Sequence, residues 1–200
     1  MNSSAPDRNA AAQPPAASAG PPAPVFRLSL VYYPDPVLRV ICAPVETFDT
    51  ALRDTIEEMF ALMRAHAGIG LAGPQVAIER QLLVCGIGDQ QLCLINPALQ
   101  ESSEPADSVE GCLSLPGVQV KVRRPERIRV SGYDPRGRKT SFAATGLWAR
   151  VIQHEMDHLN GVLICDYRRP SVKECDECPL SLPAVLVEER KHRMRPSNLL

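Results

Sequence analysis

The sequence predicts an α+β domain, in which antiparallel strands pack around a buried central helix carrying an HExxH pattern, with a second amphipathic helix near the N-terminus. Two segments have helical periodicity, and the chain between them holds short runs rich in β-branched residues that end at turns. An apolar fraction of 44 % over 200 residues is enough for one core. No apolar run approaches the roughly 18 residues of a membrane span.

Charge and cysteine content exclude several classes of protein. The 22 Lys and Arg residues nearly balance the 23 Asp and Glu residues, which leaves a formal net charge of −1. Such a chain has no large field of one sign, so we expect no direct nucleic-acid readout and no membrane partner. Seven cysteines are an odd number in a chain of this length, which favours a reducing compartment over a disulfide scaffold.

Composition divides the chain into three regions. Residues 1–24 contain eight Ala and six Pro, which predicts a disordered extension, since little there can be buried. The extension lacks the cationic start and apolar stretch of a secretory signal. Residues 25–170 form the folded domain. Residues 171–200 are a polar tail with a weak helix predicted at 184–193.

The first helix is predicted to begin after Asp49 and to stop at Gly68. Asp49 is a good N-cap, and glycine commonly ends a helix. The apolar residues follow the spacing i, i+4, i+7, i+8, i+11, namely Leu52, Ile56, Met59, Phe60 and Met63. This is the pattern of an amphipathic helix with one buried face.

A glycine-rich loop follows, from Gly68 to Gln75, and it contains the pattern GxGxxG. A dinucleotide site would need a strand before this pattern and a helix opening after it. Here a helix precedes the loop and Pro74 lies within it, so a dinucleotide site is excluded. The loop instead predicts a backbone that approaches another group closely and ends at the Gln75 amide.

The strands are predicted at residues 81–87, 91–95, 118–122, 128–133 and 139–142. Asp134-Pro135-Arg136-Gly137 joins the last two, because Pro presets φ and Gly tolerates positive φ. The charged run from Arg123 to Arg129 is interpreted as one solvated strand face and not as a nucleic-acid patch.

The second helix is predicted from Gly146 to Asn160, with Thr145 as N-cap and Gly161 beyond its end. Its apolar positions extend so far around the helix that it must be buried on most sides. His154 and His158 are four residues apart, so both imidazoles project from one face and can share a metal ion. Glu155 lies beside them as a candidate general acid or base.

A metal ion held by these two histidines needs a third protein ligand. Ile164 occupies the position that the long metzincin motif requires, which excludes that family. A glutamate ligand would have to come from the polar tail, from Glu174, Glu177, Glu188 or Glu189. The remaining choice is a cysteine. Four cysteines lie in apolar stretches typical of a core, namely Cys42, Cys85, Cys93 and Cys165. Cys112 differs, because it lies before Pro116-Gly117, where a turn can present its thiolate.

Three motifs in order, Gly68 to Gln75, Glu110 to Ser114 and Gln153 to Leu159, resemble the GφGφAxxQ loop, the EGC(L)S segment and the QHExDHL helix of the peptide deformylases. The segment from Pro34 to Arg39 is also similar to the segment that opens that family's domain. The resemblance covers residues 28–167. It implies that residues 25–170 are a metal-dependent deformylase domain.

The resemblance implies a metal centre formed by Cys112, His154 and His158, with Glu155 as general acid/base. It implies Fe²⁺ as the physiological ion, one per chain, with Zn²⁺ or Ni²⁺ as substitutes.

The resemblance also implies an oxyanion site formed by the Gln75 side-chain amide and the Leu113 backbone N–H. The loop at Gly68, Ile69 and Gly70 is then expected to bind substrate. Gln119 departs from the family, because many bacterial members carry at this position an arginine thought to help hold the peptide.

The expected reaction removes the formyl group from the N-terminal methionine of nascent polypeptides and releases formate. The expected partners are those nascent peptides and the ribosome near its exit tunnel. We expect a cytoplasmic, bacterial-type enzyme, and the extension at residues 1–24 leaves an organellar version as the alternative.

Two other functions compete with this interpretation. A zinc endopeptidase would cleave internal bonds of unformylated substrates. A module that binds metal only to fold would use a closed site that draws on Cys175 and Cys178, which form a single CxxC pair.

Overall fold

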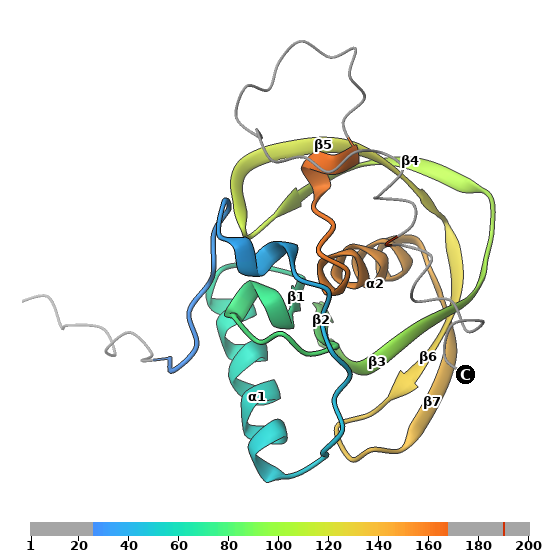
Figure 1. Cartoon of the computed structure of the whole chain (residues 1–200). Coiled ribbons are helices and arrows are strands. Elements are labelled where there is room, and N and C mark those ends of the chain that lie inside the picture. Colours follow the sequence, from blue (N-terminus) through green and yellow to red (C-terminus); the bar gives the residue numbers. More distant parts are fainter. Residues whose placement is uncertain (1–25, 168–189, 191–200) are drawn as a thin grey trace, which may run out of the picture.

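Two antiparallel sheets and two α-helices make up residues 26–167, which confirms the predicted α+β class (Figure 1). The structure is a computed structural model that describes residues 26–167 and residue 190. The predictions for the extension at residues 1–24, the helix at 184–193 and the cysteines of the C-terminal tail lie outside the described residues, except at residue 190.

The larger sheet has five strands in the order β1-β2-β3-β6-β7, and the smaller sheet is the hairpin β4-β5. The strands of the larger sheet are β1 (Gly70–Ala72), β2 (Leu82–Ile87), β3 (Gln90–Ser102), β6 (Arg127–Tyr133) and β7 (Lys139–Thr145). The hairpin consists of β4 (Pro105–Cys112) and β5 (Leu115–Pro125). Short 3₁₀ helices lie at Pro36–Arg39 (η1), Gly73–Val76 (η2) and Ile164–Tyr167 (η3).

All five predicted strands are present, but the sequence underestimated the extent of sheet. β3 continues to Ser102 through two irregularities in its pairing with β6. β4 was not predicted, because its residues are mostly polar or small; it forms by pairing with β5 from Pro105 to Cys112. The predicted turn at 134–137 is present, with Gly137 at φ 75° and the Asp134 carboxylate accepting two backbone N–H bonds.

Helix α1 (Thr50–Ala65) begins as predicted, since the Asp49 carboxylate accepts a hydrogen bond from the Leu52 N–H at 2.8 Å. The helix ends at Ala65, before the predicted stop at Gly68, and the residue with a left-handed backbone is Ala67, at φ 52°. Gly68 instead lies close to a distant part of the chain. A Cβ at this position would lie 2.7 Å from the Leu113 side chain, which comes from the β4–β5 turn.

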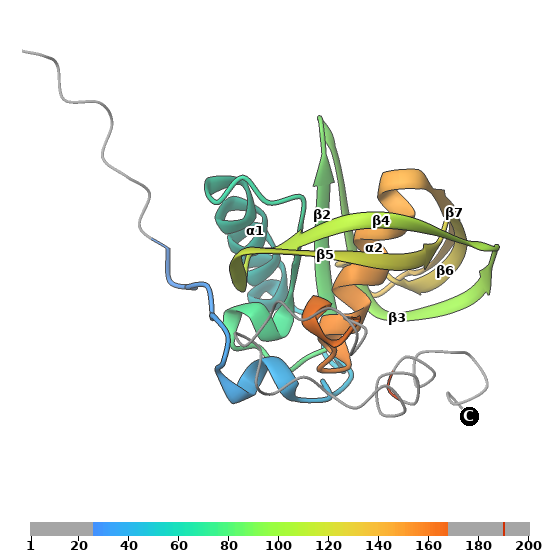
Figure 2. The ribbon, with the colours of Figure 1, turned by 90° about the horizontal axis from the view of Figure 1, so that it is seen from above.

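Helix α2 (Gly146–Leu159) lies inside the curve of the two sheets, and strands β3 to β7 bend around it (Figure 1). It packs against strands of both sheets, and the side chains of Ala149, Ile152 and Leu159 are fully buried. Thr145 occupies the N-cap position, but its side chain makes no capping hydrogen bond. Seen from above, the β4-β5 hairpin crosses over α2 (Figure 2). This arrangement brings the end of β4 to the last turns of α2.

Ion pairs and hydrogen bonds hold the segments that flank the core. Arg39 in η1 pairs with the fully buried Asp166 in η3, with Nη1 and Oδ2 2.5 Å apart. The Arg190 guanidinium donates to the Asn160 and Gly161 carbonyls at the C-terminal end of α2, where a cation complements the helix dipole. None of the described helices is long and apolar enough to cross a membrane.

Asn96 fastens the segment before α1 to the larger sheet. Its side-chain oxygen accepts the Val45 N–H at 2.8 Å, and its side-chain nitrogen donates to the Val45 carbonyl at 2.9 Å. Asn96 also has a φ of 49°, a conformation that asparagine tolerates better than most residues.

We expect Asn96→Ala to lower the free energy of unfolding by about 2–4 kcal/mol, because it removes two hydrogen bonds and strains the backbone. Urea unfolding measures the change. Asn96→Gly is the matched control. It also loses the two hydrogen bonds but adopts the positive φ without strain, so it should destabilise the protein less than Asn96→Ala does. A loss below about 0.5 kcal/mol for Asn96→Ala would contradict the prediction.

Candidate metal centre and its pocket

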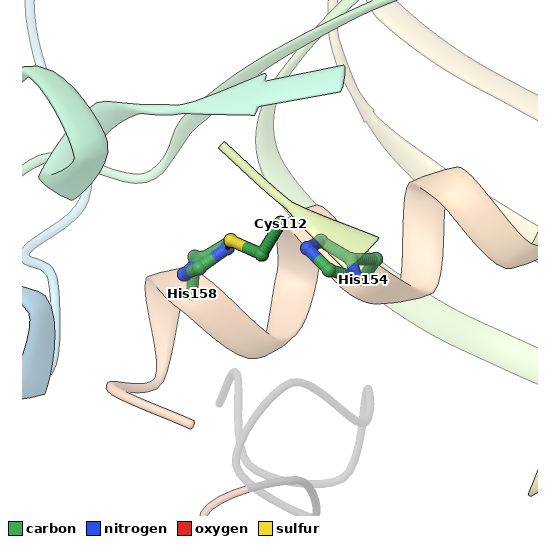
Figure 3. A group of neighbouring side chains, drawn as sticks. All are labelled: Cys112, His154 and His158. Atoms are coloured by element: carbon green, nitrogen blue, oxygen red, sulfur yellow. Dashed lines mark hydrogen bonds between the residues drawn. The ribbon is translucent and has the colours of Figure 1, made fainter. Parts of the chain in front are cut away.

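Cys112, His154 and His158 converge at the point where β4 ends against α2 (Figure 3). One donor atom from each residue lies within 4.8 Å of the other two. The Cys112 Sγ is 3.3 Å from the Nε2 of His158. His154 and His158 are separated from each other by one helical turn on α2. Both histidines are largely buried, and Cys112 is half-buried.

The chemistry of these residues fits a divalent metal ion. In a tetrahedral site with bonds of about 2.0–2.3 Å, donor atoms lie roughly 3.3–3.8 Å apart, and the 3.3 Å between the Cys112 Sγ and the His158 Nε2 agrees with this. The Nδ1 of His158 and the Oε2 of Glu155 are buried and have no hydrogen-bond partner among the described residues. Burying such atoms is costly unless another group interacts with them. A cation at the cluster would compensate the buried Glu155 carboxyl group beside it, and it would bind His158 through Nε2, the ring nitrogen that faces Cys112.

Glu110 orients His154. Its Oε2 lies 3.0 Å from the His154 Nδ1, so the carboxylate accepts the Nδ1 proton and leaves the Nε2 lone pair directed at the cluster. Burial acts to raise the pKa of Glu110, but hydrogen bonds from His154 and Arg124 outweigh it and bring the pKa down to about 2. Glu110 therefore remains an anion at neutral pH.

The Arg124 guanidinium, on β5, connects this carboxylate to the rest of the core. It donates two hydrogen bonds to Glu110, at 2.7 and 2.9 Å, and one to Asp157 on α2, at 2.8 Å. Tyr167 in η3 donates to the same Asp157 oxygen, and its ring lies 5.0 Å from the guanidinium carbon. The side chain of Arg124 is only 4 % exposed, so its charge is balanced entirely within the protein.

Glu155 lies beneath the loop that the glycines form. A Cβ at Gly70 would be 2.2 Å from the Glu155 Oε1, so only glycine allows β1 to approach this carboxyl group. The side chain of Glu155 is almost fully buried, and burial raises its pKa to about 7. A carboxyl group with this pKa can both accept and donate a proton near neutral pH.

The Gln75 side chain is also aimed at the cluster, from η2. Its Oε1 accepts the Ala72 N–H at 2.8 Å, which fixes the orientation of the amide. Its Nε2 then faces the Ser114 Oγ at 3.2 Å and the Cys112 Sγ at 3.5 Å. Leu113, which carries the other predicted oxyanion donor, follows Cys112 in the β4–β5 turn.

A pocket of about 490 Å³ opens above the cluster. The β1 loop, the β4-β5 hairpin and one face of α2 form its walls. It is lined by every residue predicted from the sequence to act in catalysis, substrate binding or metal binding except the buried His158, namely Gly68, Ile69, Gly70, Gln75, Cys112, Leu113, His154 and Glu155. Gln119 also lines it, as an exposed neutral amide.

The other cysteines of the described chain are not at this site. Cys42, Cys85 and Cys93 are buried in the core, and burial raises the pKa of the Cys42 and Cys93 thiols to about 12. A thiol with such a pKa is a poor ligand and nucleophile. Cys165 is buried against Leu38 and Leu163.

Sequence analysis missed the buried charge network. The interpretation of residues 123–129 as one solvated face is wrong for Arg124, which is buried, although Arg123 beside it is exposed. The alternation along β5 contained the signal, because Val120, Val122 and Arg124 share one face and the two valines are buried.

We expect Arg124→Met to lower the free energy of unfolding by about 3–5 kcal/mol, because it leaves the Glu110 and Asp157 carboxylates buried without their cation. Arg123→Met is the matched control. Arg123 is adjacent and exposed and lies 4.0 Å from Asp107, so its loss should cost less than about 1 kcal/mol. Chemical unfolding of both variants measures their free energies of unfolding. Equal losses in the two variants would contradict the prediction that the buried ion pairs of Arg124 stabilise the fold.

Comparison with known proteins agrees with this geometry. A sequence model described as polypeptide deformylase matches residues 27–174. A peptide deformylase of Hydrogenovibrio crunogenus is 44 % identical over 144 residues, which are 70 % of this chain and 85 % of the relative.

Solved structures give the same result. The peptide deformylase of Thermotoga maritima is 42 % identical and superposes with a TM-score of 0.70, covering 72 % of this chain and 98 % of that one. The peptide deformylase of Synechococcus elongatus in complex with actinonin is 40 % identical, with a TM-score of 0.69 over 84 % of this chain and 86 % of the other. The chain belongs to the peptide deformylase family.

Proposed function

We propose that the pocket above Cys112, His154 and His158 is the active site of a peptide deformylase. It would hydrolyse the N-formyl group of methionyl peptides and release formate. The observation that carries the proposal is the convergence of a cysteine, two histidines, a buried carboxyl group and a side-chain amide on one pocket. In this proposal α2 is the central HExxH helix, and residues 25–170 form the catalytic domain.

Cys112, His154 and His158 would hold one divalent ion per chain, and we propose Fe²⁺, with Zn²⁺ or Ni²⁺ as substitutes. A thiolate and two imidazoles suit all three metals, so the donor set is compatible with each. When bound, such an ion supplies Lewis acidity and an activated water molecule near neutral pH. Glu110 keeps His154 in the tautomer that can ligate.

Glu155 would act as general acid/base. Its carboxyl group is buried beside the cluster and has a pKa of about 7, so it can take a proton from the attacking water and give one to the leaving amine. The Nε2 of Gln75 and the backbone N–H of Leu113 would donate to the oxygen of the formyl group as negative charge develops on it. The Ala72 N–H holds the Gln75 amide in the orientation that this role needs.

The loop from Gly68 to Gly70 would bind the peptide. Ile69 is 43 % exposed and lines the pocket, with Gly68 and Gly70 on either side of it. A peptide can approach the loop backbone closely there, because two of its three residues lack side chains. The substrates would be nascent formyl-methionyl polypeptides, met in the cytoplasm near the ribosomal exit tunnel.

The activity is tested with full-length protein that is purified without oxygen, analysed for metal and assayed for formate release from a formyl-Met peptide. We expect formate with a metal-loaded sample and no cleavage of unformylated casein. Cleavage of internal peptide bonds would instead indicate an endopeptidase.

We expect Cys112→Ala to bind much less than one metal ion per chain, because it removes one of three protein ligands. Metal analysis after dialysis measures the loss. Cys93→Ala is the matched control: its thiol lies in the core, so this variant should keep its metal. The double replacement of Cys175 and Cys178 by Ser should also keep it. Loss of metal there would favour a site that serves only folding.

We expect Glu155→Gln to lower kcat by about 10²- to 10⁴-fold, because an amide cannot accept the proton of water. Its metal content should not change. Gln75→Ala should cost about 10²- to 10³-fold in rate, through the loss of one oxyanion donor, again with the metal retained. A Glu155→Gln enzyme that contains metal and has a near wild-type rate would contradict the role of Glu155.

A further inference from the structure

The charges that line the pocket are distributed unevenly. Glu110 and Glu155 lie at its buried end, and the Glu110 carboxylate is already paired with Arg124. Arg150 is the only Lys or Arg residue among the described residues that line the pocket. It is half-buried, so its charge is partly shielded from water.

Arg150 also lacks a carboxylate partner among the described residues. Its one hydrogen bond to them runs from Nε to the Gly146 carbonyl at 3.4 Å, one turn earlier in α2. No described Asp or Glu side chain lies within ion-pair distance of it. Arg124, in contrast, forms ion pairs with two carboxylates. The Arg150 guanidinium therefore keeps most of its hydrogen-bonding capacity for a ligand.

The position of Arg150 relates it to the substrate. Leu147, Arg150, Val151 and His154 all line the pocket and follow the spacing of one helix face. Arg150 precedes His154 by one turn, which places the two backbone positions roughly 6 Å apart along the helix. An extended peptide advances about 3.3 Å per residue. A peptide that ran from the cluster along this face of α2 would pass Arg150 within its first few residues.

Two exposed apolar residues line the same pocket as Arg150. Leu147 is 42 % exposed and Val109, on the facing hairpin, is 67 % exposed. Apolar surroundings weaken the competition from water for a charge pair, so a guanidinium there discriminates better between a carboxylate and a neutral side chain than one in open solvent.

We propose that Arg150 is a specificity-determining residue, which makes the enzyme favour formyl-methionyl peptides that carry an acidic side chain at their second or third residue. The proposal rests on the deformylase activity proposed above and names a class of its substrates. The contact is a hydrogen-bonded ion pair between the guanidinium and the peptide carboxylate.

The experiment compares peptides that differ only in charge. The metal-loaded full-length enzyme is assayed for kcat/KM with formyl-Met-Glu-Ala-amide against formyl-Met-Gln-Ala-amide, and with formyl-Met-Ala-Glu-amide against formyl-Met-Ala-Gln-amide. We expect the Glu peptide of at least one pair to be favoured by about 2- to 5-fold, the range of a partly exposed ion pair. The preference should shrink at 1 M salt, where the screening length falls to about 3 Å.

Variants locate the preference. Arg150→Gln should bring the Glu/Gln ratio to about 1, and Arg150→Lys should retain part of it, because the charge remains but the planar group does not. Lys139→Gln is the control: it removes one exposed charge on β7, away from the pocket, and should leave the ratio unchanged. Each ratio is measured within one preparation, so a loss of active enzyme in a variant cancels.

The outcomes separate the two proposals. Equal rates for all four peptides with the wild-type enzyme, or a preference that persists in Arg150→Gln, would overturn the role of Arg150 and leave the deformylase activity standing. Failure of the wild-type enzyme to release formate from any of the four would overturn both.

Discussion

The buried guanidinium of Arg124 is the interaction on which the arrangement of the site depends. It joins four elements, because it lies on β5 and contacts Glu110 on β4, Asp157 on α2 and Tyr167 in η3. A buried charge is costly unless all of its partners are in place. The β4-β5 hairpin can therefore dock on α2 in one register only. That register places Cys112, two residues after Glu110, beside His158.

The same network links stability to the chemistry of the site. Glu110 uses one oxygen for both Arg124 and His154, so the group that neutralises the arginine also orients one of the proposed metal ligands. Similarly, the Asp157 that receives Arg124 lies between the two histidines on α2. Some residues that stabilise the core are therefore also residues that surround the candidate site. The polar part of the core is the outer shell of the site.

Sequence reasoning succeeded where a pattern is local. The spacing of apolar residues predicted α1, Asp49 predicted its start, and the position of Cys112 before a turn distinguished it from the core cysteines. It failed where a residue is set by a partner far along the chain. Gly68 lies against Leu113, Gly70 leaves room for the Glu155 carboxyl group, and β4 is a strand because β5 pairs with it. None of these partners is visible within a window of a few residues. Arg124 is intermediate, since the alternation along β5 predicts its inward direction but not its three partners.

The buried end of the pocket and its opening differ in how their side chains are held. At the buried end, three of the polar groups are each held by another group: His154 by Glu110, Glu110 by Arg124, and the Gln75 amide by the Ala72 N–H. A substitution there disturbs both stability and chemistry. At the opening, Val109, Leu147 and Arg150 are exposed or half-buried, and their side chains support no other group of the site. These positions can change with little effect on the buried network. In the proposals made here, selection among formylated peptides would depend on the opening, and the hydrolysis would depend on the network below it.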